Sequence, residues 1–255
     1  TLRPTPTITA LAAAIVLAGC GGSDDAATPT LRVSAASSLK AALTAYGETF
    51  RPATVSNQFA ASDALAAQIE GGARPDVYAA ANEKLPAQLH AQGLVATPVP
   101  FARNRLVLAV PADSKITSLS GIARPGVTLA VGAPTVPIGS YTATVLARLP
   151  KAARSRIEAN VRSKEPDVAS IAARVQEGAV DAGFVYVTDV QASKGALRAI
   201  ELPASLEPSV VYAAAVVRGS AHPGEARRYI AGLLRGPGAR ALRPRPLSFP
   251  RGMTP

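Results

Sequence analysis

Several predicted helices are preceded by short loops of small residues that also carry a hydroxyl group. These loops occupy residues 36–39, 61–63 and 136–141, and a fourth helix start lies at 165–168. The first turn of a helix presents backbone N–H groups without intrahelical partners at the positive end of the helix dipole, so it can hold an anion. A serine at such a position is more often a simple N-cap that contributes about 1 kcal/mol. The pattern therefore predicts an anion site only if several of these helix starts converge.

Residues suited to catalysis or direct metal binding are sparse. The two histidines, His90 and His222, are far apart in the sequence, and no nucleophile-elbow, zinc-protease or phosphate-loop motif occurs. Cys20 is the single cysteine, so neither a disulfide within the chain nor a thiolate metal cluster is possible. A hydrolase with a serine–lysine pair stays open as an alternative, although no motif favours it. We therefore predict a protein with no catalytic residues and no cofactor.

The N-terminal residues have the pattern of an export signal. Arg3 precedes an apolar run over residues 8–18, which is too short for a comfortable permanent membrane span. The run ends in Leu-Ala-Gly-Cys at 17–20, which resembles a bacterial lipobox with Cys20 as the lipid acceptor. An incidental or buried cysteine is the alternative. We predict a lipoprotein signal peptide over 1–19, a flexible tether over 20–30, and a mature protein anchored by lipid to the outer face of the membrane.

The positive charge of the chain is concentrated near its C-terminus. The formal net charge is +10, but residues 235–255 carry five arginines and no acidic residue. Without that segment and Arg3 the balance is 21 basic to 17 acidic residues, or +4. No lysine and arginine cluster is interleaved with aromatic residues, so we expect no nucleic-acid partner. A mildly positive body would still help to attract anions.

Strands and helices alternate along the chain, and they would position the loops that carry the hydroxyl groups. Strand patterns cover residues 31–33, 54–59, 76–78, 105–110, 127–131, 182–186 and 210–217. Helical patterns of apolar residues cover most of the intervening segments, and several of them stop at glycine. This alternation predicts an α/β chain with mostly parallel sheets. The loops at the carboxyl ends of such strands commonly form the ligand site.

Six segments, in order along the chain, resemble the molybdate-binding proteins of ABC importers. They are AASSL at 35–39, FAASDALAAQIEGGARPDV at 59–77, RNRLVL at 103–108, VGAP at 131–134, VPIGSY at 136–141 and GFVYVTD at 183–189. The likeness spans roughly residues 31–234. It implies the type II fold of periplasmic binding proteins, in which two lobes are joined by two crossing hinge segments and close over the ligand. We expect lobe 1 at 31–109 and 205–255, and lobe 2 at 110–204.

The resemblance also implies the residues that bind the ligand. Ser38 and Ser62 should donate hydroxyl and amide hydrogen bonds, Ile138 and Val168 should donate backbone N–H groups, and Tyr186 should donate its hydroxyl group. Ile138 stands where the family usually has a small residue. Because this contact is made by the amide, the isoleucine side chain affects packing and not the number of donors.

A site made only of donors suits a fully deprotonated oxyanion. Hydrogen phosphate carries a proton that would find no acceptor there, at a cost of roughly 1–3 kcal/mol. We therefore expect molybdate or tungstate as the ligand, with the metal entering as an oxyanion and no direct protein–metal bond. Sulfate or another oxyanion, and an extracellular sensor or enzyme on the same fold, remain alternatives. An ABC permease and its ATPase are the partners that the resemblance implies.

The C-terminal segment departs from the family pattern. The family commonly ends in a helix and a short apolar segment that pack back on the first lobe. Residues 236–255 are instead rich in arginine and proline. We expect this segment to be irregular and to leave the binding site unaffected.

Overall fold

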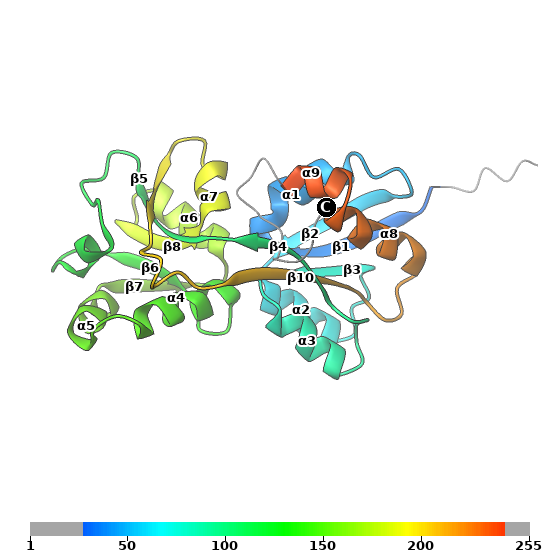
Figure 1. Ribbon diagram of the computed structural model, residues 1–255, viewed down its shortest axis with the longest axis horizontal. Coiled ribbons are helices and arrows are strands. Elements are labelled where there is room, and N and C mark those ends of the chain that lie inside the picture. Colours follow the sequence, from blue (N-terminus) through cyan, green and yellow to red (C-terminus); the bar gives the residue numbers. More distant parts are fainter. Residues whose placement is uncertain (1–27, 243–255) are drawn as a thin grey trace, which may run out of the picture.

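The computed structural model describes residues 28–242, which form two lobes that lie side by side (Figure 1). The predicted signal peptide, Cys20, most of the tether and residues 243–255 lie outside the described residues. Within residues 28–242 no helix has the length and apolar character needed to cross a membrane. Each lobe contains one five-stranded sheet with helices on both faces.

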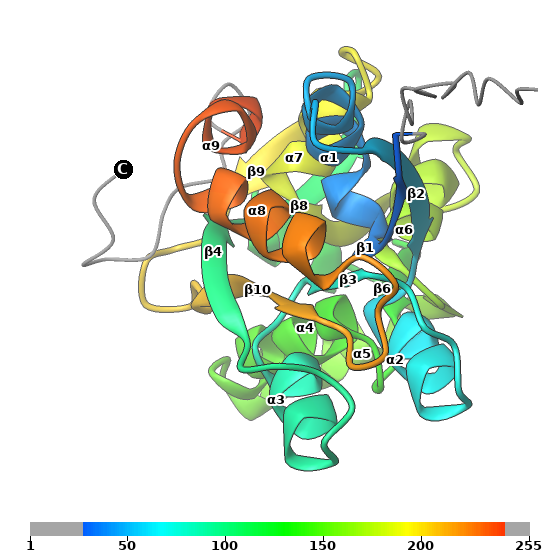
Figure 2. The ribbon, with the colours of Figure 1, turned by 90° about the vertical axis from the view of Figure 1, so that its right-hand side faces the viewer.

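The first lobe is built on a sheet with the strand order β2-β1-β3-β10-β4. Its strands are β1 (Thr30–Ala36), β2 (Thr54–Ala60), β3 (Val77–Ala80), β4 (Val99–Asn104) and β10 (Val210–Val216). Its helices are α1 (Lys40–Gly47), α2 (Ser62–Glu70), α3 (Lys84–Ala91), α8 (Pro223–Leu234) and α9 (Pro237–Leu242). Helices α2 and α3 cover one face of this sheet, and α1, α8 and α9 cover the other (Figure 2).

The second lobe repeats this plan with the strand order β7-β6-β8-β5-β9. Its strands are β5 (Leu106–Pro111), β6 (Leu129–Gly132), β7 (Val161–Glu165), β8 (Ala182–Tyr186) and β9 (Leu197–Glu201). Its α-helices are α4 (Pro137–Ala147), α5 (Lys151–Ala159), α6 (Val168–Gln176) and α7 (Val187–Ala192). Two short 3₁₀ helices, η1 (Ser37–Leu39) in the first lobe and η2 (Leu119–Ala123) in the second, complete the fold.

The sheets are mixed, which refines the expectation of mostly parallel strands. In the first sheet β1 pairs in parallel with β2 and β3, whereas β10 runs antiparallel to β3 and β4. In the second sheet β6 is parallel to β7 and β8, whereas β5 is antiparallel to β8 and β9. Strands β4 and β5 flank the first crossing, and β9 and β10 flank the return. The chain runs in opposite directions through the two crossings, so β4 pairs antiparallel with β10 and β5 pairs antiparallel with β9.

The first crossing between the lobes comes earlier than the predicted boundary at 109/110. Strand β4 ends at Asn104 in the first sheet, and β5 begins at Leu106 in the second. The run from Leu106 to Pro111 pairs with β9 over most of its length, so it cannot be divided between lobes. The chain returns through residues 202–209, between β9 and β10, and the predicted boundary at 204/205 lies inside this segment.

The C-terminal segment is partly helical, contrary to the expected irregular structure over 236–255. Helix α9 packs on α1 and α8, and its Leu242 is buried. Gly238 permits this contact, because a Cβ atom at that position would lie 2.6 Å from the carbonyl oxygen of Gly232 and 2.9 Å from the Tyr46 ring. The sequence pattern missed this helix because glycine and proline usually interrupt helices, whereas here Pro237 begins the helix and Gly238 allows close packing.

Candidate anion-binding site

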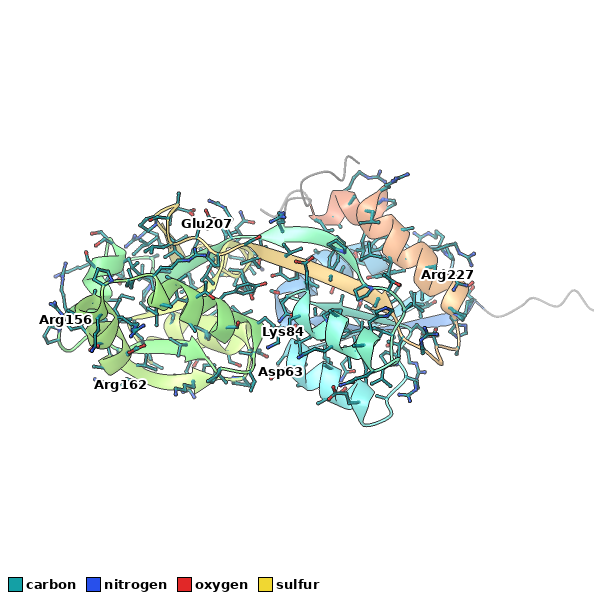
Figure 3. All side chains as sticks on the ribbon, turned by 60° about the horizontal axis from the view of Figure 1, so that its bottom comes forward. Asp63, Lys84, Arg156, Arg162, Glu207 and Arg227 are labelled. Atoms are coloured by element: carbon teal, nitrogen blue, oxygen red, sulfur yellow. The ribbon has the colours of Figure 1, made fainter. Side chains whose placement is uncertain are left out.

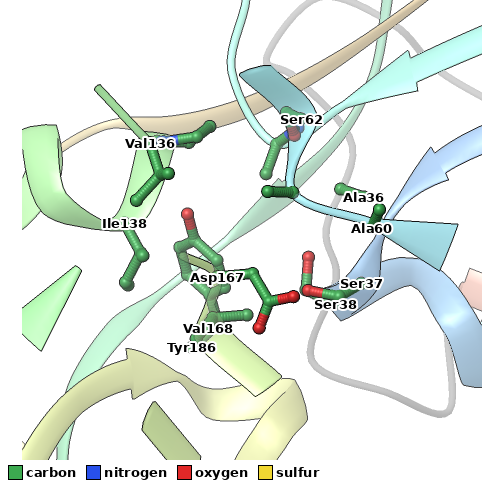
Figure 4. Close-up of a pocket in the computed structure, with 13 residues that line it drawn as sticks. Ala36, Ser37, Ser38, Ala60, Ser62, Val136, Ile138, Asp167, Val168 and Tyr186 are labelled. Atoms are coloured by element: carbon green, nitrogen blue, oxygen red, sulfur yellow. The ribbon is translucent and has the colours of Figure 1, made fainter. Parts of the chain in front are cut away.

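A small cavity lies where the two lobes meet. Its lining comes from loops at the strand ends of both lobes: Ala36, Ser37, Ser38, Ala60, Ala61, Ser62 and Ala81 from the first, and Val136, Pro137, Ile138, Asp167, Val168 and Tyr186 from the second (Figure 4). Its volume is about 20 Å³, whereas one water molecule needs about 10–15 Å³ on the same measure. In this conformation of the two lobes, the cavity therefore has room for a single small ion. All five predicted binding residues line it.

Ser62 contributes a hydroxyl group whose hydrogen-bonding direction is fixed by the protein. It is the first residue of α2, and its side chain is 2% exposed. Its Oγ accepts a hydrogen bond of 3.1 Å from the backbone N–H of Ala81, and its carbonyl oxygen accepts one of 2.7 Å from Tyr78. Because a backbone N–H can only donate, the Ser62 hydroxyl proton remains free for a ligand.

Ser38 lies in η1, directly after β1, and its Oγ is 3.0 Å from the hydroxyl oxygen of Tyr212. The N-caps of η1, α1 and α2 are Ala36, Leu39 and Ala61, none of which makes a side-chain cap hydrogen bond. Ser38 and Ser62 are therefore not N-caps, and the simple capping role that serines usually have before helices does not explain them.

Two helix starts of the second lobe supply backbone donors. Ile138 is the second residue of α4, and Val168 is the first residue of α6, so neither amide has an intrahelical partner. Gly139 brings the start of α4 against the end of β6, since a Cβ atom there would lie 1.9 Å from the carbonyl oxygen of Ala133. The Ile138 side chain is 2% exposed and packs beside the cavity.

Tyr186 brings a buried hydroxyl group to the cavity. Its side chain is 1% exposed, and its hydroxyl oxygen has no hydrogen-bond partner among the described residues. Leaving a buried polar group unpaired costs roughly 1–3 kcal/mol, so such groups are rare unless a ligand satisfies them. Burial raises the pKa of Tyr186 well above its ordinary value, so the hydroxyl stays protonated and can donate. In Figure 4 this hydroxyl points into the cavity.

Asp167 is a cavity residue that the sequence prediction missed, and it is the one charged side chain among those that line the cavity. It is the N-cap of α6, where its Oδ1 accepts a 2.8 Å hydrogen bond from the backbone N–H of Ser170. Its carboxylate is turned toward the Ser37 and Ser38 side of the cavity (Figure 4). The expectation of a site made only of donors is therefore corrected: the half-buried Asp167 carboxylate is an acceptor among the lining side chains. An acidic N-cap after Pro166 was the available signal.

No cationic side chain lines the cavity. Charged residues of both signs instead project from the outside of the lobes, as Arg156, Arg162, Glu207 and Arg227 do in Figure 3. An anion in the cavity would thus be held by hydroxyl groups, backbone N–H groups and helix dipoles. Within residues 28–242 no group of three or more His, Cys, Asp or Glu side chains is placed to hold a metal ion.

Comparisons with known proteins find relatives that are named as binding proteins of transporters. The molybdate-binding protein ModA of Mycobacterium tuberculosis is 33% identical over 252 residues, covering 92% of this chain and 94% of that protein. A second relative is YvgL of Bacillus subtilis, which is named as a putative ABC transporter substrate-binding lipoprotein. It is 32% identical over 238 residues, and the match covers 87% of this chain and 89% of YvgL. The periplasmic molybdate-binding protein of Azotobacter vinelandii has the same fold, with a TM-score of 0.75 and 21% identity. The superposition covers 87% of this chain and 100% of that protein.

The resemblance seen in the sequence is thus confirmed at the level of the family. The family of bacterial extracellular solute-binding proteins matches residues 31–244, which include both lobes and every residue of the cavity. This chain belongs to that family.

Proposed function

We propose that this protein captures molybdate or tungstate outside the cell and delivers the oxyanion to an ABC importer. This proposal rests above all on the buried Tyr186 hydroxyl, which lines the cavity and has no hydrogen-bond partner among the described residues. A dianion with four acceptor oxygens would satisfy this hydroxyl together with Ser38, Ser62 and the first turns of α4 and α6. The names of the relatives ModA and YvgL support the same ligand class and transport role.

The cavity also bears on the alternatives. The cavity volume is about 20 Å³, which is small for an acyl or sugar substrate, and the hydroxyl groups of Ser38 and Ser62 are hydrogen-bonded to Tyr212 and to the Ala81 N–H, neither of which is a general base. We therefore propose a binding protein and not an enzyme. Sulfate has the same charge and shape as molybdate and differs in size, so the relative affinities of the two anions decide between them. Permease and ATPase partners follow from the family and the proposed transport role.

We further propose that the mature protein is held to the membrane by lipid on Cys20. The support is the lipobox-like Leu-Ala-Gly-Cys at 17–20 and the lipoprotein name of the relative YvgL. A mature domain joined to its anchor by a tether would remain close to the importer while its lobes open and close.

Thermal unfolding tests the ligand assignment directly. A ligand that binds only the folded protein raises the midpoint temperature in proportion to the logarithm of its concentration once it exceeds the dissociation constant. We expect molybdate and tungstate at millimolar concentration to raise the midpoint of the mature domain by several degrees, and phosphate to leave it unchanged. Equal shifts with all anions would indicate a general salt effect and contradict the proposal.

A further inference from the structure

A chain of buried hydrogen bonds connects Ser38 to the first crossing between the lobes. Asn104 is the last residue of β4, and its Nδ2 lies 3.0 Å from Tyr212 Oη and 3.0 Å from Thr188 Oγ1. Tyr212 Oη in turn lies 3.0 Å from Ser38 Oγ. The exposed fractions of Asn104, Tyr212 and Thr188 are 5%, 0% and 7%, so water does not compete for these contacts.

The direction of each hydrogen bond in this series, from Asn104 through Tyr212 to Ser38, follows from one backbone group. Asn104 Oδ1 accepts a 2.8 Å hydrogen bond from the N–H of Arg105, and a backbone N–H can only donate. The oxygen of the amide is thus identified, and its amino group must face Tyr212 and Thr188. An amino group cannot accept, so the Tyr212 hydroxyl accepts from it and needs another acceptor for its own proton.

Ser38 is that acceptor. Among residues 28–242 the hydroxyl of Tyr212 has two hydrogen-bond contacts, Asn104 Nδ2 and Ser38 Oγ. Burial raises the pKa of Tyr212, so its proton is retained. Ser38 Oγ therefore accepts from Tyr212, and its own proton is free to point into the cavity, as the proton of Ser62 is for the same reason at Ala81. Hydrogen bonds that run in one direction also polarise and strengthen one another.

We propose that Tyr212 and Asn104 are positioning residues that hold Ser38 as a donor and so make the site discriminate against protonated oxyanions. The inference rests on the proposed function and adds the origin of its selectivity. With Ser38 and Ser62 both held as donors, a ligand that carries a proton loses two hydroxyl groups that could have accepted it. Among the lining side chains, the Asp167 carboxylate and the Ser37 hydroxyl remain as acceptors. A serine released from Tyr212 could rotate and accept that proton.

The test compares sulfate with phosphate, which have similar size and differ in carrying a proton near pH 7. Their affinities are measured by titration calorimetry, or by displacement of molybdate where binding is weak. We expect Tyr212→Phe to weaken molybdate binding about tenfold and to lower the ratio of sulfate to phosphate affinity by about tenfold, which corresponds to one hydrogen bond to a charged ligand. The ratio is informative because a general structural defect weakens both anions equally.

Tyr46→Phe is the matched control. Tyr46 is a buried tyrosine of the same lobe, and its hydroxyl donates at 3.2 Å to the carbonyl oxygen of Tyr229, outside the cavity. This variant should leave both the molybdate affinity and the anion ratio as in the wild type. A change in the ratio equal to that of Tyr212→Phe would overturn the proposal.

Asn104→Asp keeps the test decisive if Tyr212→Phe unfolds. It replaces the donating amino group with an acceptor, which draws the Tyr212 proton away from Ser38 and should lower the ratio in the same direction. Where Tyr212→Phe folds, a double variant measures the coupling: in a Ser38→Ala background, Tyr212→Phe should have little additional effect on molybdate affinity, since its action passes through Ser38. Independent, additive effects would show that no such coupling exists.

The outcomes separate the two proposals. If the wild type binds none of the oxyanions, the proposed function fails and the positioning role fails with it. If the wild type binds molybdate but the sulfate-to-phosphate ratio is unchanged in both Tyr212→Phe and Asn104→Asp, the positioning role alone is wrong.

Discussion

At the scale of single residues, two buried tyrosines differ in where their hydroxyl groups lie. Tyr186 and Tyr229 are both fully buried, and the hydroxyl groups of both have no partner among the described residues, but only Tyr186 lines the cavity. The proposed function therefore assigns a ligand contact to Tyr186 and none to Tyr229. Asp167 is the opposite case, because its charge opposes the binding of an anion while its capping oxygen stabilises α6.

Replacing Tyr186 with Phe should separate binding from stability. The variant removes an unpaired buried hydroxyl, so we expect the unliganded protein to unfold at an equal or higher temperature. We also expect molybdate affinity to fall by roughly 1–3 kcal/mol, because the hydroxyl is a donor to a buried charge. Calorimetry and thermal unfolding of Tyr186→Phe and its control Tyr229→Phe check this. A loss of affinity in the control as large as in Tyr186→Phe would contradict the assignment.

Replacing Asp167 with Asn should strengthen anion binding. Asparagine caps helices about as well as aspartate, so α6 should still begin at Val168, and its amino group would add a donor where a negative charge was. We expect molybdate to bind several-fold more tightly, with the gain largest at low salt, where charge repulsion is least screened. Glu177→Gln removes one charge outside the cavity and serves as the control. Unchanged or weaker binding in Asp167→Asn would show that its charge does not face the ligand.

At the scale of the elements, close approach between backbones sets where the helix starts lie. The start of α4 reaches the end of β6 because residue 139 is glycine, and its neighbour Ile138 thereby presents its amide to the cavity. The sequence indicated this helix start and those of α2 and α6, because their residue types are local signals. It did not indicate α9, β7 or β9, whose formation depends on tertiary packing or on pairing with distant strands.

Gly139→Ala tests the importance of that contact. The added Cβ would meet the Ala133 carbonyl oxygen at 1.9 Å, so α4 must shift away from β6. We expect a loss of stability of about 1–3 kcal/mol together with weaker molybdate binding. In Gly224→Ala the Cβ has its nearest neighbour at 4.0 Å, and alanine favours a helix, so this control should be as stable as the wild type or more so. Normal affinity in Gly139→Ala would argue against a ligand contact from α4.

At the scale of the whole molecule, the site exists only where the two lobes meet. Each lobe supplies part of the cavity lining, and the Tyr141 hydroxyl of α4 lies 3.4 Å from the carbonyl oxygen of Ala81 in the other lobe. The sequence predicted five binding residues through its resemblance to a family, and all five line the cavity. It did not reveal Asn104, Tyr212 or Asp167, because their roles depend on which side chains meet across the crossing and the cleft.

Cys20→Ser tests how the whole protein is held at the cell surface. If Cys20 carries the lipid, its replacement should move the protein from the membrane fraction to the soluble fraction, because a short tether alone has no affinity for the bilayer. Cell fractionation with immunodetection measures the distribution, and metabolic labelling with a radioactive fatty acid measures the modification. Retention of both membrane association and label in the variant would contradict lipidation at Cys20.

We expect the cavity to select a deprotonated tetrahedral oxyanion of the size of molybdate. Titration calorimetry of the domain that begins at Thr30, with molybdate, tungstate, sulfate and phosphate in turn, measures this selectivity. We predict tight one-to-one binding of molybdate and tungstate, weaker binding of sulfate and the weakest response to phosphate. Tight binding of phosphate, or no binding of any of the four anions, would show that the cavity is not a molybdate site.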